Sequence, residues 1–363
     1  MRIHEGADMI DTDTFYRESC ELGYVKLEAV ARNVKWTSPT EWGNLEITIN
    51  LSKPEKDPRD IAAAAAAKAT GKADYIDPAT GVFRPCPLCV TEADVERGYA
   101  RRLQLGGEPW GLWYSPYAYY DEHCIAMSWE HRPMHIDRAT FGCLFDVVDQ
   151  LPQYFFGSNA DLPIVGGSIL GHDHFQGGEH VFPMQLAPVC EPFDLRGFPE
   201  VSAGVVKWPI SVIRLCGQSR TQLVDAACEV LDSWRSYDDE EAGIVSESGG
   251  ARHNTITPIL CKSEGGYQLD LALRCNITSE EHPLGVFHPH ERLHHIKKEN
   301  IGLIEVMGMA ILPPRVQKVM DEQGLSRDDV GRLCGQVLEC AGVFKWDADG
   351  RAAQRRFIQV LAG

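Results

Sequence analysis

The sequence predicts an α+β protein with largely antiparallel sheets flanked by helices, and three observations indicate this class. Segments in which apolar and polar residues alternate, such as 45–51, are typical of half-buried strands. Segments with apolar residues at every third or fourth position, such as 137–151, are typical of amphipathic helices. These segments follow in the order strands, helix, strands, and then again strands with helices. This order indicates two related halves.

The first elements lie in the N-terminal third of the chain. Residues 1–44 are mixed in character and carry no strong site signal. Apolar residues alternate from Leu45 to Leu51, which predicts a strand that ends at the proline-containing segment 53–58. The alanine run at 62–67 predicts a short helix followed by a loop.

The middle of the chain predicts a hairpin and then a helix. Strands are expected at 110–114 and 123–129, joined by a turn at 116–120. The segment 137–151 places its apolar residues on one helical face, and Asp137 and Thr140 suit the first turn.

The C-terminal part repeats this mixture of strands and helices. Further elements are expected as helices at 221–234 and 326–338 and strands at 256–261, 267–274 and 302–312. We therefore expect an N-terminal segment at 1–44, one half at 45–200 and a second half at 201–363.

Composition limits the function classes. The 363 residues are 44% hydrophobic and 24% charged, as in an ordinary globular protein, and no apolar run approaches the roughly 20 residues that span a bilayer. A formal net charge of −17 argues against binding nucleic acid or an anionic membrane, which require a basic surface. The twelve cysteines, without an export signal, are interpreted as reduced thiols plus a metal site, so we expect a cytoplasmic protein.

The segment 166–178, GGSILGHDHFQGG, carries the strongest functional signal. On an extended strand His172, His174 and Gln176 would share one face and point toward one substrate. Imidazole is a competent nucleophile toward phosphorus, and a glutamine amide can donate to a phosphoryl oxygen. The flanking glycines would let a bulky anion approach the backbone. The alternative is a surface histidine pair or a fortuitous metal site.

A second signal is the Cys-x-x-Cys of Cys86 and Cys89, which alone fits a zinc knuckle, a redox pair or coincidence. Zinc needs two further ligands, and histidines are common. His131 and His172 would complete a closed, structural Cys₂His₂ site. The alternative is that His131 is a surface histidine and the cysteines hold something else.

A histidine-rich loop offers a candidate second metal site. Its candidate ligands are His288, His290, Glu291, His294 and His295. The alternative, a polar loop lining a cleft, is the simpler interpretation.

Several stretches resemble one family, the hexose-1-phosphate uridylyltransferases, and within it the bacterial second type of galactose-1-phosphate uridylyltransferase. The matching stretches are GSNADLPIV at 157–165, NLSKPEKDP at 50–58, YSPY at 114–117, EHPLGV at 281–286 and LHHIKKENIGLIEVMG at 293–308. The resemblance covers most of the chain from about Phe15 onward. Members of this type carry a longer helical N-terminal region, and the chain departs from them there.

The resemblance extends to the histidine-triad superfamily, whose strand reads His-x-His-x-His, and implies two histidine-triad-like halves. Here the third position is Gln176. Glutamine cannot titrate, so it can hold a phosphoryl oxygen without activating water. The resemblance also implies a homodimer.

Roles for individual residues follow from the resemblance. It implies His174 as the nucleophile, His172 as its zinc-binding neighbour and Gln176 as the group that stabilises the transferred phosphoryl. It further implies phosphate contacts from Asn159 and Ser168 and a uracil border at Tyr117. Finally, it implies sugar-phosphate contacts from Lys297 and Lys298.

The resemblance implies transfer of UMP from UDP-glucose to galactose 1-phosphate through a uridylyl-histidine, with a structural Zn²⁺. Three alternatives remain. The acceptor could be another hexose 1-phosphate; the enzyme could be a dinucleotide hydrolase or phosphorylase; or the chain could be a non-catalytic, zinc-stabilised binding module.

Overall fold

The computed structural model describes residues 10–52, 75–76, 83–166 and 169–363. The proline-containing segment 53–58 and the expected alanine helix at 62–67 lie outside the described residues, as does Ser168. Within the described residues, no helix combines the length and apolar character needed to cross a bilayer.

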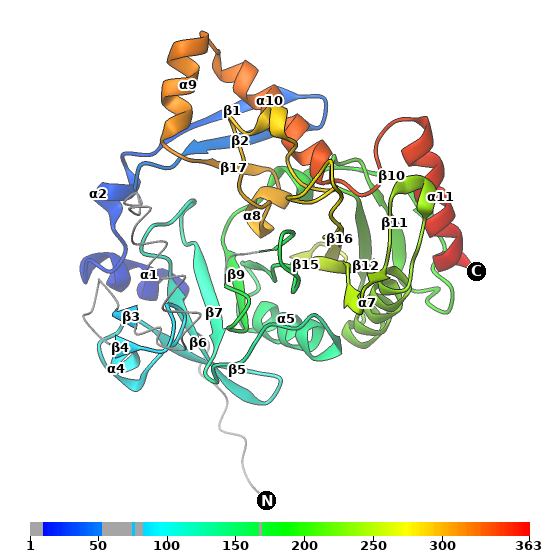
Figure 1. Ribbon diagram of the computed structural model, residues 1–363. Coiled ribbons are helices and arrows are strands. Elements are labelled where there is room, and N and C mark those ends of the chain that lie inside the picture. The colour runs from blue at the N-terminus through cyan, green and yellow to red at the C-terminus, as the bar shows by residue number, and fades with distance from the viewer. Residues whose placement is uncertain (1–9, 53–74, 77–82, 167–168) are drawn as a thin grey trace, which may run out of the picture.

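The centre of the molecule is a ten-stranded sheet in the order β10-β11-β12-β16-β15-β8-β9-β7-β6-β5, with every neighbouring pair antiparallel (Figure 1). Its strands are β5 (Arg101–Leu105), β6 (Glu108–Tyr114), β7 (Cys124–Ser128), β8 (Phe155–Gly157), β9 (His174–Gly178), β10 (Val189–Phe193), β11 (Ser202–Val206), β12 (Val212–Gly217), β15 (Asn254–Ser263) and β16 (Gly266–Cys275). The strands expected at 110–114, 123–129, 256–261 and 267–274 are confirmed.

The sheet consists of two halves with the same topology. In each half the strands are ordered first, second, third, fifth, fourth across the sheet, as β5-β6-β7-β9-β8 and β10-β11-β12-β16-β15. A helix joins the third strand to the fourth in both halves, α5 (Arg138–Gln150) in one and α7 (Arg220–Arg235) in the other. The halves meet where β8 pairs with β15, with Gly157 opposite Ile259. The expected α+β class with two related, antiparallel halves is therefore confirmed.

One face of the sheet is covered by α5 and α7, which lie side by side (Figure 1). Both helices begin where the local sequence indicates. The carboxylate of Asp137 accepts from the backbone N–H of Thr140, and the Ser219 hydroxyl caps α7 in the same way. Their apolar faces pack on the sheet in the larger of the two main cores, which includes Phe145 and Trp234.

The opposite face is covered by a smaller sheet and α10 (Arg327–Ala341), which enclose a second core. In this sheet β2 (Gly43–Ile49) lies between antiparallel β1 (Val34–Thr40) and parallel β17 (Met309–Leu312). The strand expected at 45–51 and the helices expected at 137–151, 221–234 and 326–338 are confirmed.

The single strand expected at 302–312 is wrong. The segment forms the short helix α8 (Leu303–Val306) and then β17, and Gly308, at φ 104°, reverses the chain between them. The carboxylate of Glu305 accepts from the Gly302 N–H, and the Asn159 side chain accepts from the Leu303 N–H. These two bonds satisfy the first donors of the helix, which a continuous strand would not need.

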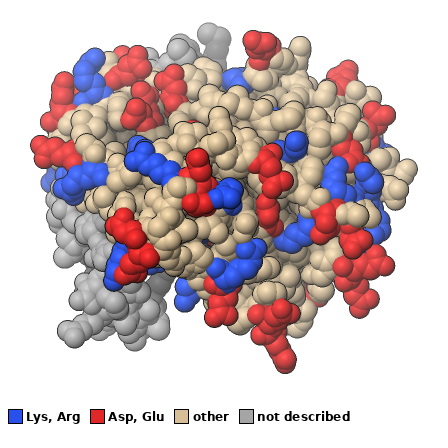
Figure 2. All heavy atoms as spheres, turned by 90° about the horizontal axis from the view of Figure 1, so that it is seen from above, with Lys and Arg blue, Asp and Glu red and all other residues tan. Residues whose placement is uncertain are grey.

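The remaining elements surround these layers. They are α1 (Thr12–Glu21), α2 (Leu27–Val30), β3 (Tyr75–Ile76), β4 (Phe83–Arg84), α4 (Glu92–Glu96), α6 (Pro183–Leu186), the 3₁₀ turn Glu240–Ala242, β13 (Glu247–Ser248), β14 (Ala251–Arg252), the 3₁₀ turn Glu291–Leu293, α9 (Arg315–Gln323) and α11 (Ala348–Ala362). Figure 2 shows that acidic and basic side chains are interspersed on one face of the molecule. That face offers no continuous basic surface of the kind that nucleic acid requires.

Candidate active site and metal cluster

Four side chains from three separate segments converge beside the histidine strand. The Sγ atoms of Cys86 and Cys89 lie 3.5 Å apart, and Nδ1 of His172 is 3.1 Å from the first and 3.7 Å from the second. Nδ1 of His131 lies 3.3 Å from Sγ of Cys89. All four ligand atoms lie within 4.8 Å of one another. The grouping of Cys86, Cys89, His131 and His172 expected from spacing is therefore present.

The cluster fits a tetrahedral metal ion. With metal–sulfur bonds of about 2.3 Å and metal–nitrogen bonds of about 2.0–2.1 Å, neighbouring ligand atoms should be about 3.3–3.8 Å apart. The observed separations approach this range. The other ring nitrogen of His172, Nε2, donates to the carbonyl oxygen of Ser128 at 2.8 Å. This bond presents the Nδ1 lone pair to the cluster, as the outer partner of a metal-bound histidine does.

His174 is the first residue of β9, and His172 precedes the strand. The two histidines therefore do not share one substrate-facing surface, because His172 contacts the metal cluster instead. Nδ1 of His174 donates to the carbonyl oxygen of His172 at 2.7 Å, so a backbone carbonyl holds one ring nitrogen. Nε2 is then the unprotonated nitrogen of the neutral ring. Burial lowers the pKa of His174 to about 4.

Gln176 lies two residues further along β9, on the same face as His174, and is only partly buried. Its Oε1 lies 3.2 Å from Nε2 of His123, the residue that precedes β7. His123 is 3% exposed, and burial lowers its pKa to about 4. The imidazole of His123 is therefore neutral at physiological pH.

The buried ring of His123 should make the protein less stable in mild acid. Its pKa is about 4 when folded and near 6.5 when unfolded, so between these values the unfolded chain binds a proton that the folded chain does not. Stability from this residue is complete above about pH 6.5 and is lost as pH falls toward 4. We expect the free energy of unfolding to drop by about 2 kcal/mol more in the wild type than in His123→Gln between pH 7 and 5.

Denaturant unfolding of both proteins across this pH range measures the difference. The metal cluster is the same in both proteins, so its own acid sensitivity cancels. Parallel pH profiles for the two proteins would show that His123 is not held neutral by burial.

Comparison with known proteins places this geometry in a family. The family model for the N-terminal domain of galactose-1-phosphate uridyl transferase matches residues 9–133, and that for the C-terminal domain matches residues 147–330. The chain belongs to this family. It is 44% identical to the galactose-1-phosphate uridylyltransferases of Streptococcus pneumoniae (strain Hungary19A-6) and Bacillus subtilis (strain 168). Each alignment covers 96% of this chain, with 77% of the first relative and 76% of the second.

Solved structures offer a more distant likeness. Yeast Ap4A phosphorylase Apa2 in complex with Ap4A is similar at a TM-score of 0.49 and 12% sequence identity, over 91% of this chain and 95% of that one. A likeness at this level carries no functional argument.

The glycines at the C-terminal end of the segment 166–178 have a different role from the one expected. A Cβ atom at Gly177 would lie 2.5 Å from the carbonyl oxygen of Phe155, and one at Gly178 would lie 2.6 Å from that of Glu122. The space left by these two glycines is filled by neighbouring backbone, so it does not admit an anion. Of the described glycines in the segment, only Gly171 would direct a Cβ into open space.

The expected phosphate and uracil contacts lie in different surroundings. Asn159 is buried two residues after β8, and continuing the β8–β9 register would bring it opposite His174. Its Oδ1 accepts from Leu303 N–H at 2.9 Å, so that oxygen is engaged. Tyr117 is partly exposed in the loop between β6 and β7.

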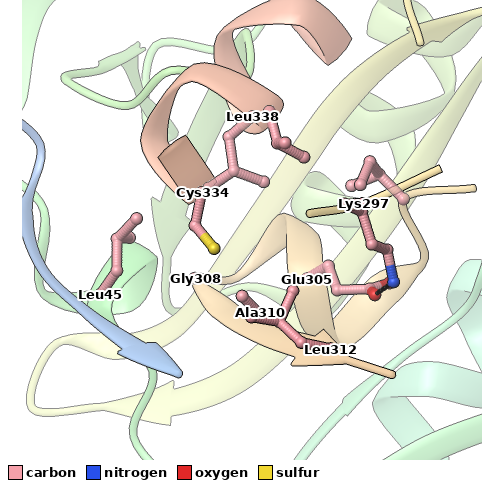
Figure 3. A pocket seen from close by; sticks show the side chains of 10 residues that line it. Leu45, Lys297, Glu305, Gly308, Ala310, Leu312, Cys334 and Leu338 are labelled. Carbon is pink, nitrogen blue, oxygen red and sulfur yellow. Dashed lines mark hydrogen bonds and ion pairs between the residues drawn. The ribbon is translucent and has the colours of Figure 1, made fainter. Parts of the chain in front are cut away.

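The two lysines differ sharply. Lys297 is buried, and its ammonium donates to Glu305 and to the carbonyl oxygen of Ile311. Figure 3 shows the Lys297 and Glu305 side chains directed toward each other at the edge of a small interior pocket. The charge of Lys297 is therefore already neutralised inside the fold. Lys298 is exposed.

Sequence reasoning missed three buried polar residues on the face of the sheet that carries His174. His123 is one. Arg274 is 1% exposed, and only its Nη2 has a hydrogen-bond partner, the carbonyl oxygen of Ile301. Burial lowers its pKa to about 10. The hydroxyl of Thr257, on the adjacent strand, is also buried without a partner. No motif marks these residues, because each matters only through its place in the sheet.

The histidine-rich loop does not assemble a metal site among the described residues, where the cysteine-containing cluster is the only such group of three or more ligands. His288 contacts Asn300, and His290 stacks on His282 at 4.4 Å between ring centroids. His294 lies 2.9 Å from the carbonyl oxygen of Pro289.

Proposed function

We propose that this protein transfers UMP from UDP-glucose to galactose 1-phosphate through a covalent uridylyl-histidine at His174, as an enzyme of galactose metabolism. Membership of the galactose-1-phosphate uridyl transferase family supports the reaction. The observation that carries the assignment of the nucleophile is the hydrogen bond from Nδ1 of His174 to the carbonyl oxygen of His172. That bond leaves the lone pair on Nε2, where attack on phosphorus requires it.

The reaction proceeds in two displacements. In the first, Nε2 of His174 attacks the α-phosphorus of UDP-glucose, and the bond to the bridging oxygen breaks. Glucose 1-phosphate leaves with the electron pair of that bond. In the second, a phosphate oxygen of galactose 1-phosphate attacks the same phosphorus, the N–P bond breaks and His174 is regenerated. Both steps place negative charge on phosphoryl oxygens, so fixed hydrogen-bond donors accelerate them.

The proposed supporting contacts are those that the family resemblance implies. The amide N–H groups of Gln176 would donate to the phosphoryl oxygens in both steps. Asn159 and Ser168 would contact phosphate, and Tyr117 would border the uracil. Of the two lysines, the exposed Lys298 is the better candidate for the sugar phosphate, because Lys297 is already paired with Glu305.

We propose that Cys86, Cys89, His131 and His172 hold one structural Zn²⁺. The two thiolates and two imidazoles suit zinc, and four protein ligands leave no open position for chemistry. When bound, the ion would neutralise the thiolates and hold His172, whose carbonyl orients His174. We also propose a homodimer in the cytoplasm, and the location is supported by the lack of any disulfide among the twelve cysteines.

A stoichiometric test separates transfer from hydrolysis. With UDP-glucose alone we expect one burst of glucose 1-phosphate per active site and negligible steady release of UMP, because Gln176 cannot activate water. Galactose 1-phosphate should then release UDP-galactose from the modified enzyme. Rapid quenching followed by chromatography of both products measures the burst.

Continuous UMP release from UDP-glucose alone would instead identify a hydrolase. No burst and no protein adduct would exclude the covalent mechanism. The same assay with a panel of sugar 1-phosphates determines which hexose is preferred.

A further inference from the structure

His123, which is buried, and Gln176, which is partly buried, form a hydrogen-bonded pair across two neighbouring strands. In the antiparallel pairing of β7 with β9, Ile125 is opposite Gln176. His123 lies two residues before Ile125 and so faces the same side of the sheet, diagonal to Gln176. This places Nε2 of His123 3.2 Å from Oε1 of Gln176.

The hydrogen-bond roles in this pair follow from the chemistry of the two groups. An amide oxygen only accepts, so the His123 ring must carry its proton on Nε2. Nδ1 is then an acceptor, and it is buried without a hydrogen-bond partner. The other tautomer would bury an N–H with no acceptor and set two acceptors against each other. Burial also keeps the ring neutral, with its pKa lowered to about 4.

Aromatic packing prevents the ring of His123 from turning away. Tyr119 stacks on it at 5.5 Å between centroids with planes 24° apart, and Tyr120 packs at 4.7 Å. The hydroxyl of Tyr120 donates to the carbonyl oxygen of Gly177 at 3.1 Å, which ties this aromatic group to β9. The donor therefore lies at a fixed place beside Gln176.

We propose that His123 is a positioning residue for uridylyl transfer, which fixes the amide of Gln176 so that its N–H groups face the phosphoryl oxygens. Because Oε1 is engaged by His123, the amide nitrogen is directed elsewhere, and it makes no hydrogen bond to the described residues. A flipped amide would present a lone pair to an anionic oxygen and would oppose the reaction. The inference rests on the proposed function, since it assumes that Gln176 contacts the transferred group.

Two similar variants test the proposal. His123→Gln keeps an amide donor near the position of Nε2, whereas His123→Asn has the same polarity but is too short to reach Gln176. We expect His123→Asn to slow release of glucose 1-phosphate in a single turnover by roughly 10–100-fold, less than the roughly 10²–10³-fold cost of deleting a donor. His123→Gln should stay within about threefold of the wild type. The KM for UDP-glucose should change little in either variant.

A double-mutant cycle separates positioning from a general structural role. If His123 acts through Gln176, His123→Asn should add no loss of rate in a Gln176→Ala background. If it only supports the fold, the two losses should multiply. His180→Phe is a matched control, because His180 stacks on Tyr120 and is hydrogen-bonded to Glu46 rather than to Gln176. We expect its rate to equal that of the wild type.

The outcomes discriminate the two hypotheses. Equal rates for His123→Asn and the wild type, or multiplicative losses in the cycle, would overturn the role of His123 and leave the proposed function intact. Failure of the wild type to form any adduct with UDP-glucose would overturn the proposed function itself. If His123→Asn does not fold but His123→Gln does, the cycle is run with His123→Phe in place of His123→Asn. Its rates are judged by the same criteria.

Discussion

Replacing His174 by alanine should abolish uridylyl transfer. The variant has no nucleophile for the α-phosphorus, and water in its place would lack both activation and orientation. We expect the rate of glucose 1-phosphate release to fall by at least about 10⁴-fold. Binding of UDP-glucose should remain within a few fold of the wild type, because alanine removes only the reacting group. Mass spectrometry of the protein after UDP-glucose treatment follows the transfer to the protein, and calorimetric titration measures the binding of UDP-glucose.

Two variants sharpen the experiment on His174. His174→Gly creates space for free imidazole, so added imidazole together with UDP-glucose should restore part of the release of glucose 1-phosphate. His253→Ala is the control, because His253 is hydrogen-bonded to Ser248 and Asn276 away from β9 and should leave the rate unchanged. Near-normal turnover by His174→Ala would show that the mechanism is not covalent at this residue.

Loss of the metal should be the largest effect on stability. The cluster joins three parts of the chain: the segment at Cys86 and Cys89, His131 beyond β7, and His172, which lies two residues before the proposed nucleophile. An ion that binds only the folded state stabilises it by about 4 kcal/mol when its free concentration is a thousandfold above Kd. We expect Cys89→Ser to lower the free energy of unfolding by about this amount, and chelation to do the same to the wild type.

Metal analysis and thermal unfolding measure this effect, and X-ray absorption spectroscopy measures the lengths of the metal–ligand bonds. Zinc should show sulfur ligands at about 2.3 Å and nitrogen ligands at about 2.0–2.1 Å. Cys190→Ser is the matched control, because Cys190 is an exposed free thiol outside the cluster. Substrate preference should change less than stability. Equal stability of Cys89→Ser and Cys190→Ser, with no metal in the wild type, would contradict the metal site.

The main helices could be predicted from the sequence because their determinants are local. Asp137, Ser219 and Ser326 each cap the helix that follows them, and the apolar stripe of each helix repeats within a few residues. The strands at 254–263 and 266–275 could be predicted equally well from the sequence, because two runs of strand-forming residues flank a short turn.

The segment 302–312 shows where local information failed. Its apolar run is compatible with either a strand or a buried helix, and periodicity alone does not distinguish them. The choice between helix and strand depends on Asn159, which is distant in sequence. Its side chain accepts a hydrogen bond from the first N–H of α8. Likewise the resemblance implied a sugar-phosphate contact from Lys297, but only the fold brings Glu305 against its ammonium group.

The sequence by itself determined the fold class, because the helices that join the third and fourth strands of each half are encoded locally. It also determined the residue types of the site: two thiols, the imidazoles and a glutamine in place of a third histidine. Only the tertiary structure decided which of these groups meet. Cys86 and His172 are 86 residues apart, and no spacing rule requires their contact. His123 reaches Gln176 only because β7 pairs with β9 in one register, and a shift of one residue would turn its side chain to the other face.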